Sequence, residues 1–266
     1  MIKKFDSYFK ENHKKNMISN RFEFFDYDIS SILPNHIKFD SNIYSDYIIK
    51  YRNINTKKIC VIVTDNYSGI KGVHFLPKKN IVFTSNESSD YIFDYNNNCK
   101  IIHIPLLNNN PITESFVPLE QRKYFYSFVG SKTHKVRSEI VDLLNNDNCL
   151  VTFEKVNIQE FNSIVANSIF TLCPRGVNVS SYRICEALRY GSIPVYISDD
   201  FILPENFEDY GIAIHSDNLK GLHDLLVSIS SKEINRLIEN GKRYYQKLFT
   251  YEGLNNWIYE KLKTLA

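Results

Sequence analysis

The chain has 266 residues, of which 43% are hydrophobic and 14% aromatic, so it can bury a sizeable core. Its 32 basic and 30 acidic residues give a net charge of +2, which provides no electrostatic case for nucleic-acid binding. No segment has the ~20 consecutive apolar residues of a membrane span, and the N-terminus lacks the apolar core of a secretory signal. We therefore expect a folded cytoplasmic protein whose basic, aromatic N-terminal segment makes at most peripheral contact with the inner face of a membrane.

The first half of the chain contains three short apolar runs separated by turn-rich sequence. These runs predict buried strands at Lys58–Thr64, Asn80–Thr84 and Lys100–Leu106. The polar, proline-containing stretch Asn108–Gln121 then predicts a linker. We accordingly expect an N-terminal α/β lobe over residues 1–118.

The second half alternates between strand-like and helix-like segments. The predicted strands are Tyr124–Val129, Cys149–Phe153, Ile169–Cys173, Ile193–Ile197 and Tyr210–Ile214, and the predicted helices are Thr133–Asn145, Ile158–Ala166, Ser181–Tyr190, Leu219–Ser228 and Glu233–Leu248. Such alternation indicates a parallel sheet with helices on both faces. Residues 119–250 therefore predict a Rossmann-like lobe, followed within residues 251–266 by a helix that can pack back on the first lobe.

A dense group of charged, glycine and serine residues follows the strand predicted at Ile169–Cys173. The chain turns through Pro174-Arg175-Gly176, and a helix begins near Ser180, a good N-cap residue. In an open α/β sheet, ligands bind where strands end and helices begin, because free N–H groups and the helix dipole favour an anion there. The permanently charged fork of Arg175 suits a diphosphate.

Arg183 and Glu186 lie three positions apart in this predicted helix, so they share one face. Taken alone, such a pair is commonly an ordinary surface ion pair. The apolar face formed by Ile184, Ala187 and Leu188 places the pair either at the margin of the sheet or open to a cleft. The helix by itself leaves both interpretations open.

Several motifs recur in order in this half, at compatible spacing. They are YFYSFVGSKTHKVRSEIVDLL, LCPRG, SSYRICEALRYGSIPV and ISDDFILPENFEDYGIAI. Together, over about residues 100–250, they resemble the exostosin-type glycosyltransferase family. The resemblance implies a GT-B fold, in which two Rossmann-like lobes bind the acceptor mainly on the N-terminal side and the donor nucleotide mainly on the C-terminal side.

The resemblance also implies roles for individual residues. Arg175 and Arg183 would face the donor diphosphate, and Glu186 would accept hydrogen bonds from the ribose hydroxyls. Gly130 and Ser131 would bring the backbone close to the donor. The complete predicted donor-binding set is Gly130, Ser131, Arg175, Gly176, Ser180, Ser181, Arg183 and Glu186.

The implied reaction is an inverting transfer from a nucleotide sugar, expected to be a UDP-sugar, to a hydroxyl of a glycan or lipid-linked glycan in surface polysaccharide synthesis. The nucleotide sugar is a substrate, and we expect neither a cofactor nor a metal. In agreement, no D-x-D motif stands at a predicted strand end, and the adjacent Asp199 and Asp200 would point apart. The five cysteines lack metal-ligand spacing and predict buried free thiols.

An inverting transfer needs a general base that takes the proton of the acceptor hydroxyl. The candidates are Asp65, after the first predicted strand, and Glu87 and Asp90, after the second. Each follows the carboxyl end of a strand, where it would face a cleft between lobes. Asp65 can equally form a turn or cap a helix.

Two other functions fit part of the pattern. A fucosyltransferase-like enzyme that uses a GDP-sugar also has an acidic helix before an A-L-x-x-G-x-x-P-V strand, although the PRG turn favours the exostosin type. A non-catalytic sugar-binding or scaffold protein can retain the same fold, because fold does not fix function. Such a scaffold would have no use for Arg175, Arg183 and Glu186 together.

Overall fold

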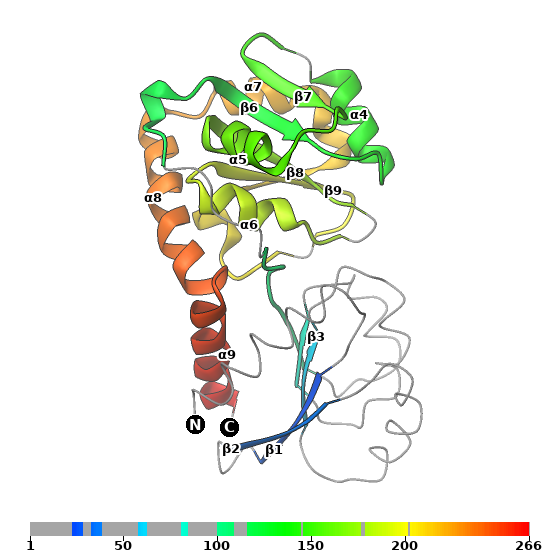
Figure 1. Ribbon diagram of the computed structural model, residues 1–266, viewed down its shortest axis with the longest axis vertical. Helices are drawn as coiled ribbons and strands as arrows, with labels where there is room; N and C mark the ends of the chain where they lie inside the picture. Colours follow the sequence, from blue (N-terminus) through cyan, green and yellow to red (C-terminus); the bar gives the residue numbers. More distant parts are fainter. Residues whose placement is uncertain are drawn as a thin grey trace. The chain divides into compact units, whose positions relative to one another are not determined.

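A computed structural model of the chain describes residues 23–28, 33–38, 58–62, 81–84, 100–108, 116–144, 146–176, 179–201 and 203–265 (Figure 1). The chain divides into two compact units, one formed by residues 1–106 with 250–266 and the other by residues 107–249. Within the described ranges, no helix combines the length and apolar character that a bilayer crossing requires.

The first unit contains a five-stranded sheet of mixed direction. Its strands are β1 (Glu23–Asp28), β2 (Leu33–Lys38), β3 (Lys58–Ile62), β4 (Ile81–Thr84) and β5 (Lys100–His103), in the order β2-β1-β3-β4-β5. Strand β1 runs antiparallel to β2 and β3, whereas β3, β4 and β5 are parallel. The three strands predicted for this half are confirmed at slightly shorter lengths, and β1 and β2 are additional.

The unit also includes helix α9 (Tyr251–Leu265). Leu254, Trp257 and Ile258 are buried along it, with the three- and four-residue spacing of one helical face. The helix predicted within residues 251–266 is thus confirmed, and it takes up nearly the whole of that segment.

The second unit is built on a parallel five-stranded sheet. Its strands are β6 (Tyr124–Val129), β7 (Cys149–Thr152), β8 (Ser168–Pro174), β9 (Ile193–Ser198) and β10 (Ile212–His215), in the order β10-β9-β8-β6-β7. Numbered from its first strand, this is the 2-1-3-4-5 order of a doubly wound sheet. The strand order reverses between β6 and β8, and ligands of such sheets bind beyond the carboxyl ends of the strands at this switch point.

Helices connect these strands as the sequence predicts. They are α4 (Lys135–Leu143), α5 (Ile158–Ala166), α6 (Tyr182–Arg189), α7 (Leu222–Val227) and α8 (Ser231–Leu248), with short 3-10 turns η2 (Leu119–Gln121), η3 (Phe207–Asp209) and η4 (Ser216–Gly221). Helices α5 and α6 pack side by side on one face of the sheet, and α4 packs with η4 on the other (Figure 1). The start of α6 differs from the prediction: its N-cap is Ser181, not Ser180, because Ser181 still has extended dihedral angles.

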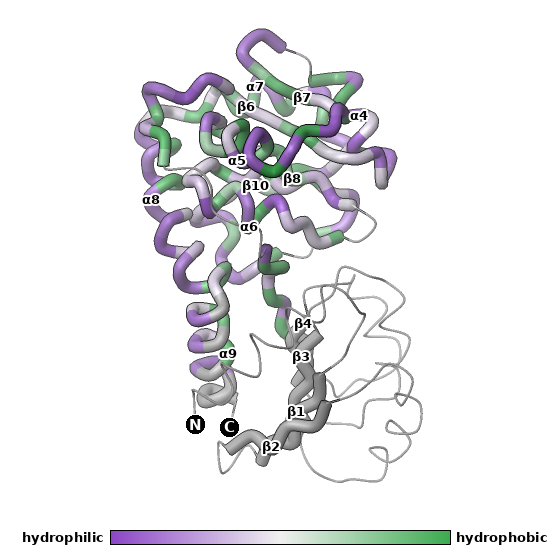
Figure 2. The backbone as a smooth tube through the Cα atoms, in the orientation of Figure 1, coloured by the Kyte–Doolittle hydropathy of each residue, from purple (hydrophilic) through white to green (hydrophobic). Residues whose placement is uncertain are grey.

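The main core lies between the sheet and helices α4, α7 and α8. Tyr126, Phe128, Phe170 and Leu172 from the strands are at most 1% exposed and belong to one cluster with side chains of these helices. Figure 2 shows hydrophobic residues along the strands and hydrophilic ones mainly on the peripheral helices and loops. Since full burial of one such side chain contributes about 1.5–3 kcal/mol, this cluster is the main source of the unit's stability.

A buried arginine joins three separate segments of the unit. The Arg122 guanidinium donates to the main-chain carbonyls of Val117 at 3.1 Å, Ser168 at 3.0 Å and Gly191 at 2.9 Å. Burial lowers the pKa of Arg122 to about 10, so the group is still charged at neutral pH. Gly191 has a φ of 72°, a conformation that glycine adopts at little cost.

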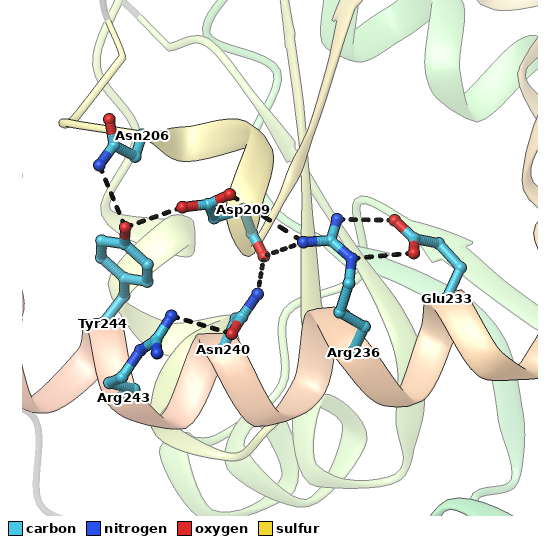
Figure 3. A network of polar contacts seen from close by, with 7 residues as sticks. All are labelled: Asn206, Asp209, Glu233, Arg236, Asn240, Arg243 and Tyr244. Atoms are coloured by element: carbon cyan, nitrogen blue, oxygen red, sulfur yellow. Dashed lines mark hydrogen bonds and ion pairs between the residues drawn. The ribbon is translucent and has the colours of Figure 1, made fainter.

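A polar network holds the chain that follows β9 on helix α8 (Figure 3). The Tyr244 hydroxyl donates to Asp209 Oδ2 at 2.9 Å and accepts from Asn206 Nδ2 at 3.2 Å. Asn240 Nδ2 donates to the Asp209 carbonyl at 2.9 Å, and Arg236 Nη1 approaches the same carbonyl at 3.4 Å. The network fixes turn η3, which follows the Leu203-Pro204 motif.

Candidate functional site

A pocket of about 480 Å³ lies beyond the carboxyl ends of β6 and β7, beside helix α6. It is lined by Val129, Gly130, Ser131, Glu154, Lys155, Val156, Ile158, Phe161, Arg183 and Glu186. The volume falls in the range of ~300–1,000 Å³ that small-molecule sites occupy. It adjoins the switch point between β6 and β8, near which a doubly wound fold places its ligand.

The structure brings half of the predicted donor-binding residues together around this pocket. Gly130, Ser131, Arg183 and Glu186 line it. The remaining residues, Arg175, Gly176, Ser180 and Ser181, lie on the connection between β8 and α6 and are not among the lining residues.

Arg183 is fixed by two aromatic rings and two acceptors. Its guanidinium carbon lies 5.3 Å from the ring centre of Phe128 and 5.4 Å from that of Phe161. Its Nη1 group donates to Glu186 Oε2 at 3.2 Å, and its Nη2 group donates to the Val129 carbonyl. The side chains of Arg183 and Glu186 are only 17% and 9% exposed, so theirs is not an ordinary surface ion pair.

Gly130 is required by this arrangement. A Cβ atom at position 130 would lie 2.7 Å from Arg183 Nη2 and 2.7 Å from Phe128 Cζ, closer than real Cβ contacts occur. Any side chain there would push the guanidinium from the end of β6. The glycine that directly follows strand β6 therefore makes room for an arginine of helix α6.

Glu186 presents a buried carboxylate to the pocket. Its Oε2 atom accepts from Arg183, and its Oε1 atom accepts from the side-chain amide of Asn108. Burial raises the pKa of Glu186 above its ordinary value, although the charges of Arg183 and Arg189 and the Asn108 hydrogen bond act in the opposite direction. Each carboxylate oxygen can accept more than one hydrogen bond, so the group can still receive hydroxyl donors of a ligand.

Arg175 forms an ion pair with Asp199 at the carboxyl ends of β8 and β9. Burial opposes ionisation of Asp199, but the hydrogen bond and charge of Arg175 outweigh it and lower the pKa of this carboxyl. Asp199 is thus occupied by an arginine. In the part of the chain that the structure describes, no three His, Cys, Asp or Glu side chains gather as a metal site would require.

Arg137, in the first turn of α4, was not assigned a role from the sequence. Its Nε donates to the Arg175 carbonyl at 2.9 Å, its Nη1 to the Ser131 carbonyl at 3.3 Å and its Nη2 to the Pro174 carbonyl at 3.4 Å. Burial and the nearby charge of Arg183 lower the pKa of Arg137 to about 10, which leaves it charged at neutral pH. It ties together the two loops on either side of the switch point.

After the end of β8 and at the start of α6, three buried hydrogen-bonding groups find no partner among the residues that the structure describes. They are Arg175 Nε, Arg183 Nε and the hydroxyl of Ser181, which is the N-cap of α6 but makes no capping bond. Buried polar groups are nearly always paired, so such a concentration indicates a place where a ligand supplies the acceptors. The N-terminus of α6 adds main-chain N–H groups, which favour an anion.

The candidate general bases Asp65, Glu87 and Asp90 lie outside the described residues. Their position relative to the pocket therefore stays a prediction. The same holds for the arrangement of the two units as GT-B lobes.

Comparisons with known proteins agree with the motifs. Over 104 residues the chain is 32% identical to the Exostosin-1 homolog of Caenorhabditis elegans, covering 38% of this chain and 27% of that protein. Over 89 residues it is 35% identical to a protein of Oryza sativa subsp. japonica named as a probable glucuronosyltransferase, covering 31% and 21%. The chain thus spans less than a third of the length of these relatives.

Among solved structures, the chain has a partial likeness to HepE from Anabaena, solved in complex with UDP and glucose. It shares 10% sequence identity and a TM-score of 0.43, covering 86% of this chain and 84% of that one. The Exostosin GT47 domain itself matches residues 35–229, a segment that contains the PRG turn, helix α6 and every residue lining the pocket. Because that match covers well over half of the sequence, the chain belongs to the exostosin GT47 family.

Proposed function

We propose that this chain is an inverting glycosyltransferase that moves a sugar from a nucleotide-sugar donor to a hydroxyl of a glycan acceptor. The observation that carries the proposal is the pocket beside the switch point, where the buried Glu186 carboxylate and the Arg183 guanidinium, both from one face of α6, meet the end of β6. Membership of the exostosin GT47 family supports it. The two units would act as the lobes of a GT-B enzyme, with the second one binding the donor.

The parts of the donor match different parts of the site. The ribose hydroxyls donate to the Glu186 carboxylate, which lines the pocket. The diphosphate accepts hydrogen bonds from Arg175, Arg183 and the Ser181 hydroxyl, each of which has a buried donor in need of an acceptor. The main-chain N–H groups at the N-terminus of α6 add to these donors. The flat nucleobase packs on the apolar side chains of the pocket wall, which include Val156, Ile158 and Phe161.

The chemistry follows from these contacts. The acceptor oxygen forms a bond to the anomeric carbon, while the bond from that carbon to the diphosphate oxygen breaks and a general base takes the hydroxyl proton. Negative charge grows on the departing diphosphate, and fixed guanidinium groups stabilise it more in the transition state than in the ground state. With arginines in this role, we propose that the reaction needs no metal, and we expect most of the activity to persist in the presence of EDTA.

The substrate class follows from the family. We propose a UDP-sugar donor and a glycan or lipid-linked glycan acceptor in surface polysaccharide synthesis, in the cytoplasm or peripherally at the inner face of the membrane. UDP-glucuronic acid belongs among the first donors to test, because a relative bears the name of a glucuronosyltransferase.

A melting experiment with UDP, GDP and CMP tests the donor site, since a ligand that binds the native protein raises its Tm. We expect UDP to raise the Tm of the wild type but not that of Arg183→Ala. The matched control is Arg236→Ala, which breaks an exposed arginine–glutamate pair of the same spacing on α8, away from the pocket. Stabilisation by GDP alone would support the fucosyltransferase-like alternative, and stabilisation by none of the three would contradict the proposal.

A screen of nucleotide sugars with mass detection of nucleotide release then identifies the donor. The same assay with EDTA tests the metal-independent chemistry. Loss of activity on chelation, with recovery on addition of Mn²⁺ or Mg²⁺, would contradict the proposed role of the arginines.

A further inference from the structure

Asn108 contacts helix α6 through both its side chain and its main chain. The side-chain amide donates to Glu186 Oε1, and the main-chain carbonyl accepts from Arg189 Nη2. Glu186 and Arg189 lie one turn apart on the same helix, so the two contacts fix the position and the orientation of the asparagine. Arg189 is itself held by the Tyr245 hydroxyl at 3.2 Å from its Nε group.

The contact from Asn108 completes the environment of the Glu186 carboxylate. Arg183 donates a hydrogen bond to Oε2, and Asn108 donates one to the second carboxylate oxygen, Oε1. With one donor on each oxygen, rotation of the carboxylate about its terminal bond would break at least one hydrogen bond. The acceptor positions that face the pocket are therefore held in place before a ligand arrives.

The same contact influences the proton affinity of Glu186. Burial raises the pKa of this carboxyl, and the charges of Arg183 and Arg189 and the Asn108 hydrogen bond lower it again. Among the described residues, Arg137, Cys173 and Cys185 also interact electrostatically with Glu186. Removal of the amide therefore favours the protonated form, in which the carboxyl has lost part of its capacity to accept hydrogen bonds.

We propose that Asn108 is a positioning residue of the donor site, whose side-chain amide holds the Glu186 carboxylate in the orientation that accepts the ribose hydroxyls. The proposal rests on the proposed function, because it assumes that Glu186 binds the ribose. It assigns a role to a residue that stands 78 positions before its partner and outside the motifs of α6.

Calorimetric titration of UDP into the full-length protein tests this role. We expect Asn108→Ala to weaken UDP binding by roughly 10-fold at neutral pH, the effect of one hydrogen bond to a charged group. The acidic limb of the affinity profile should move to higher pH in this variant. Turnover at saturating donor should change much less than the donor KM, because the ribose contact is made in both ground and transition states.

Two further variants show whether a loss of UDP affinity is specific to the contact between Asn108 and Glu186. Asn240→Ala is the control for loss of an asparagine amide, since Asn240 on α8 donates to the main-chain carbonyl of Asp209 in turn η3. This variant should bind UDP normally. In Glu186→Gln, an added Asn108→Ala substitution should have little further effect on UDP affinity, because the two residues act through one interaction.

The same titrations distinguish a failure of the proposed function from a failure of the role proposed for Asn108. Unchanged UDP affinity in Glu186→Gln would overturn the ribose assignment of the proposed function. Weakened binding in Glu186→Gln, with unchanged affinity and an unchanged pH profile in Asn108→Ala, would overturn the role of Asn108 alone. A lowered Tm of Asn108→Ala without a change in UDP binding would likewise mean that the residue is merely structural.

Discussion

The Nε group of Arg137 donates a 2.9 Å hydrogen bond to the main-chain carbonyl of Arg175. Because Arg137 also reaches the Ser131 carbonyl, it holds two loops that approach the pocket from different strands. A single helix residue thus sets the distance between the end of β6 and the PRG turn.

Substitution of Arg137 should affect stability and binding together. An ammonium group cannot reproduce the fork that reaches three carbonyls, so we expect Arg137→Lys to lose about 1.5–3 kcal/mol of unfolding free energy and to bind UDP more weakly. Urea denaturation and calorimetry measure the two effects. Arg243→Lys on α8, whose Nη2 group contacts Asn240, is the control. Wild-type values for both quantities in Arg137→Lys would refute the role.

Gly130→Ala tests the close approach of Arg183 to the end of β6. The added methyl would lie 2.7 Å from Arg183 Nη2, so the guanidinium must move and UDP affinity should fall by roughly 10-fold or more. Gly221→Ala is the matched control, because a Cβ there meets nothing within 4 Å. Equal UDP affinity in the two alanine variants would show that the approach is not needed.

Arg175→Ala should remove a contact that strengthens as the leaving group gains charge. We expect a loss of roughly 2–4 kcal/mol of transition-state stabilisation, measured from kcat/KM. Arg175→Lys should restore activity only in part, since an ammonium is not a planar fork. A near-normal kcat/KM of Arg175→Ala would rule out its role at the diphosphate.

The stability of the protein should depend on pH through Glu186. Its pKa in the folded state is raised above the ordinary value of 4.5 by burial. As the pH rises from the pKa of Glu186 in the unfolded chain to its higher pKa in the folded chain, Glu186 loses its proton first in the unfolded chain. The free energy of unfolding therefore decreases over this pH range and is constant above it. Denaturation of wild type and Glu186→Gln over a pH series measures this difference. Parallel pH profiles of the two proteins would contradict the shift.

The general base should affect turnover without affecting nucleotide binding. Asp65→Asn, Glu87→Gln and Asp90→Asn are the substitutions to compare, and loss of the base should lower kcat by ~10²–10⁴. Glu186→Ala should instead raise the donor KM more than it lowers kcat. Steady-state kinetics with calorimetry separates the two patterns. Full turnover by all three variants would place the base elsewhere.

The strands of the second unit could be predicted because buried parallel strands are continuous apolar runs. All six residues of β9 (Ile193–Ser198) are buried, and its sequence is correspondingly apolar. Strands β1 and β2, EFFDYD and LPNHIK, mix charged and apolar residues, and β2 contains a proline. Their antiparallel pairing with each other is a property of the folded chain, which the local pattern does not encode.

The site was predictable to the extent that it depends on one helix. The three-residue spacing of Arg183 and Glu186 fixes their common face, and the structure places both on the pocket. The roles of Asn108 and Arg137 could not be predicted, because most of their contacts are made with residues far away in the sequence. Asn108 reaches a carboxylate 78 residues away, and Arg137 binds main-chain carbonyls, which carry no sequence signal.

The buried Arg122 has a consequence for how the second unit unfolds. The carbonyls that solvate it belong to residues 117, 168 and 191, which come together only when the strands β8 and β9 are both in place. A form in which one of these segments has detached would leave a cation in an apolar interior with too few acceptors, at a cost of several kcal/mol. Partly opened forms are thereby disfavoured relative to both the native and the fully unfolded chain. Arg122 thus couples the start of β8 to the turn before β9, so that detachment of one segment favours detachment of the other.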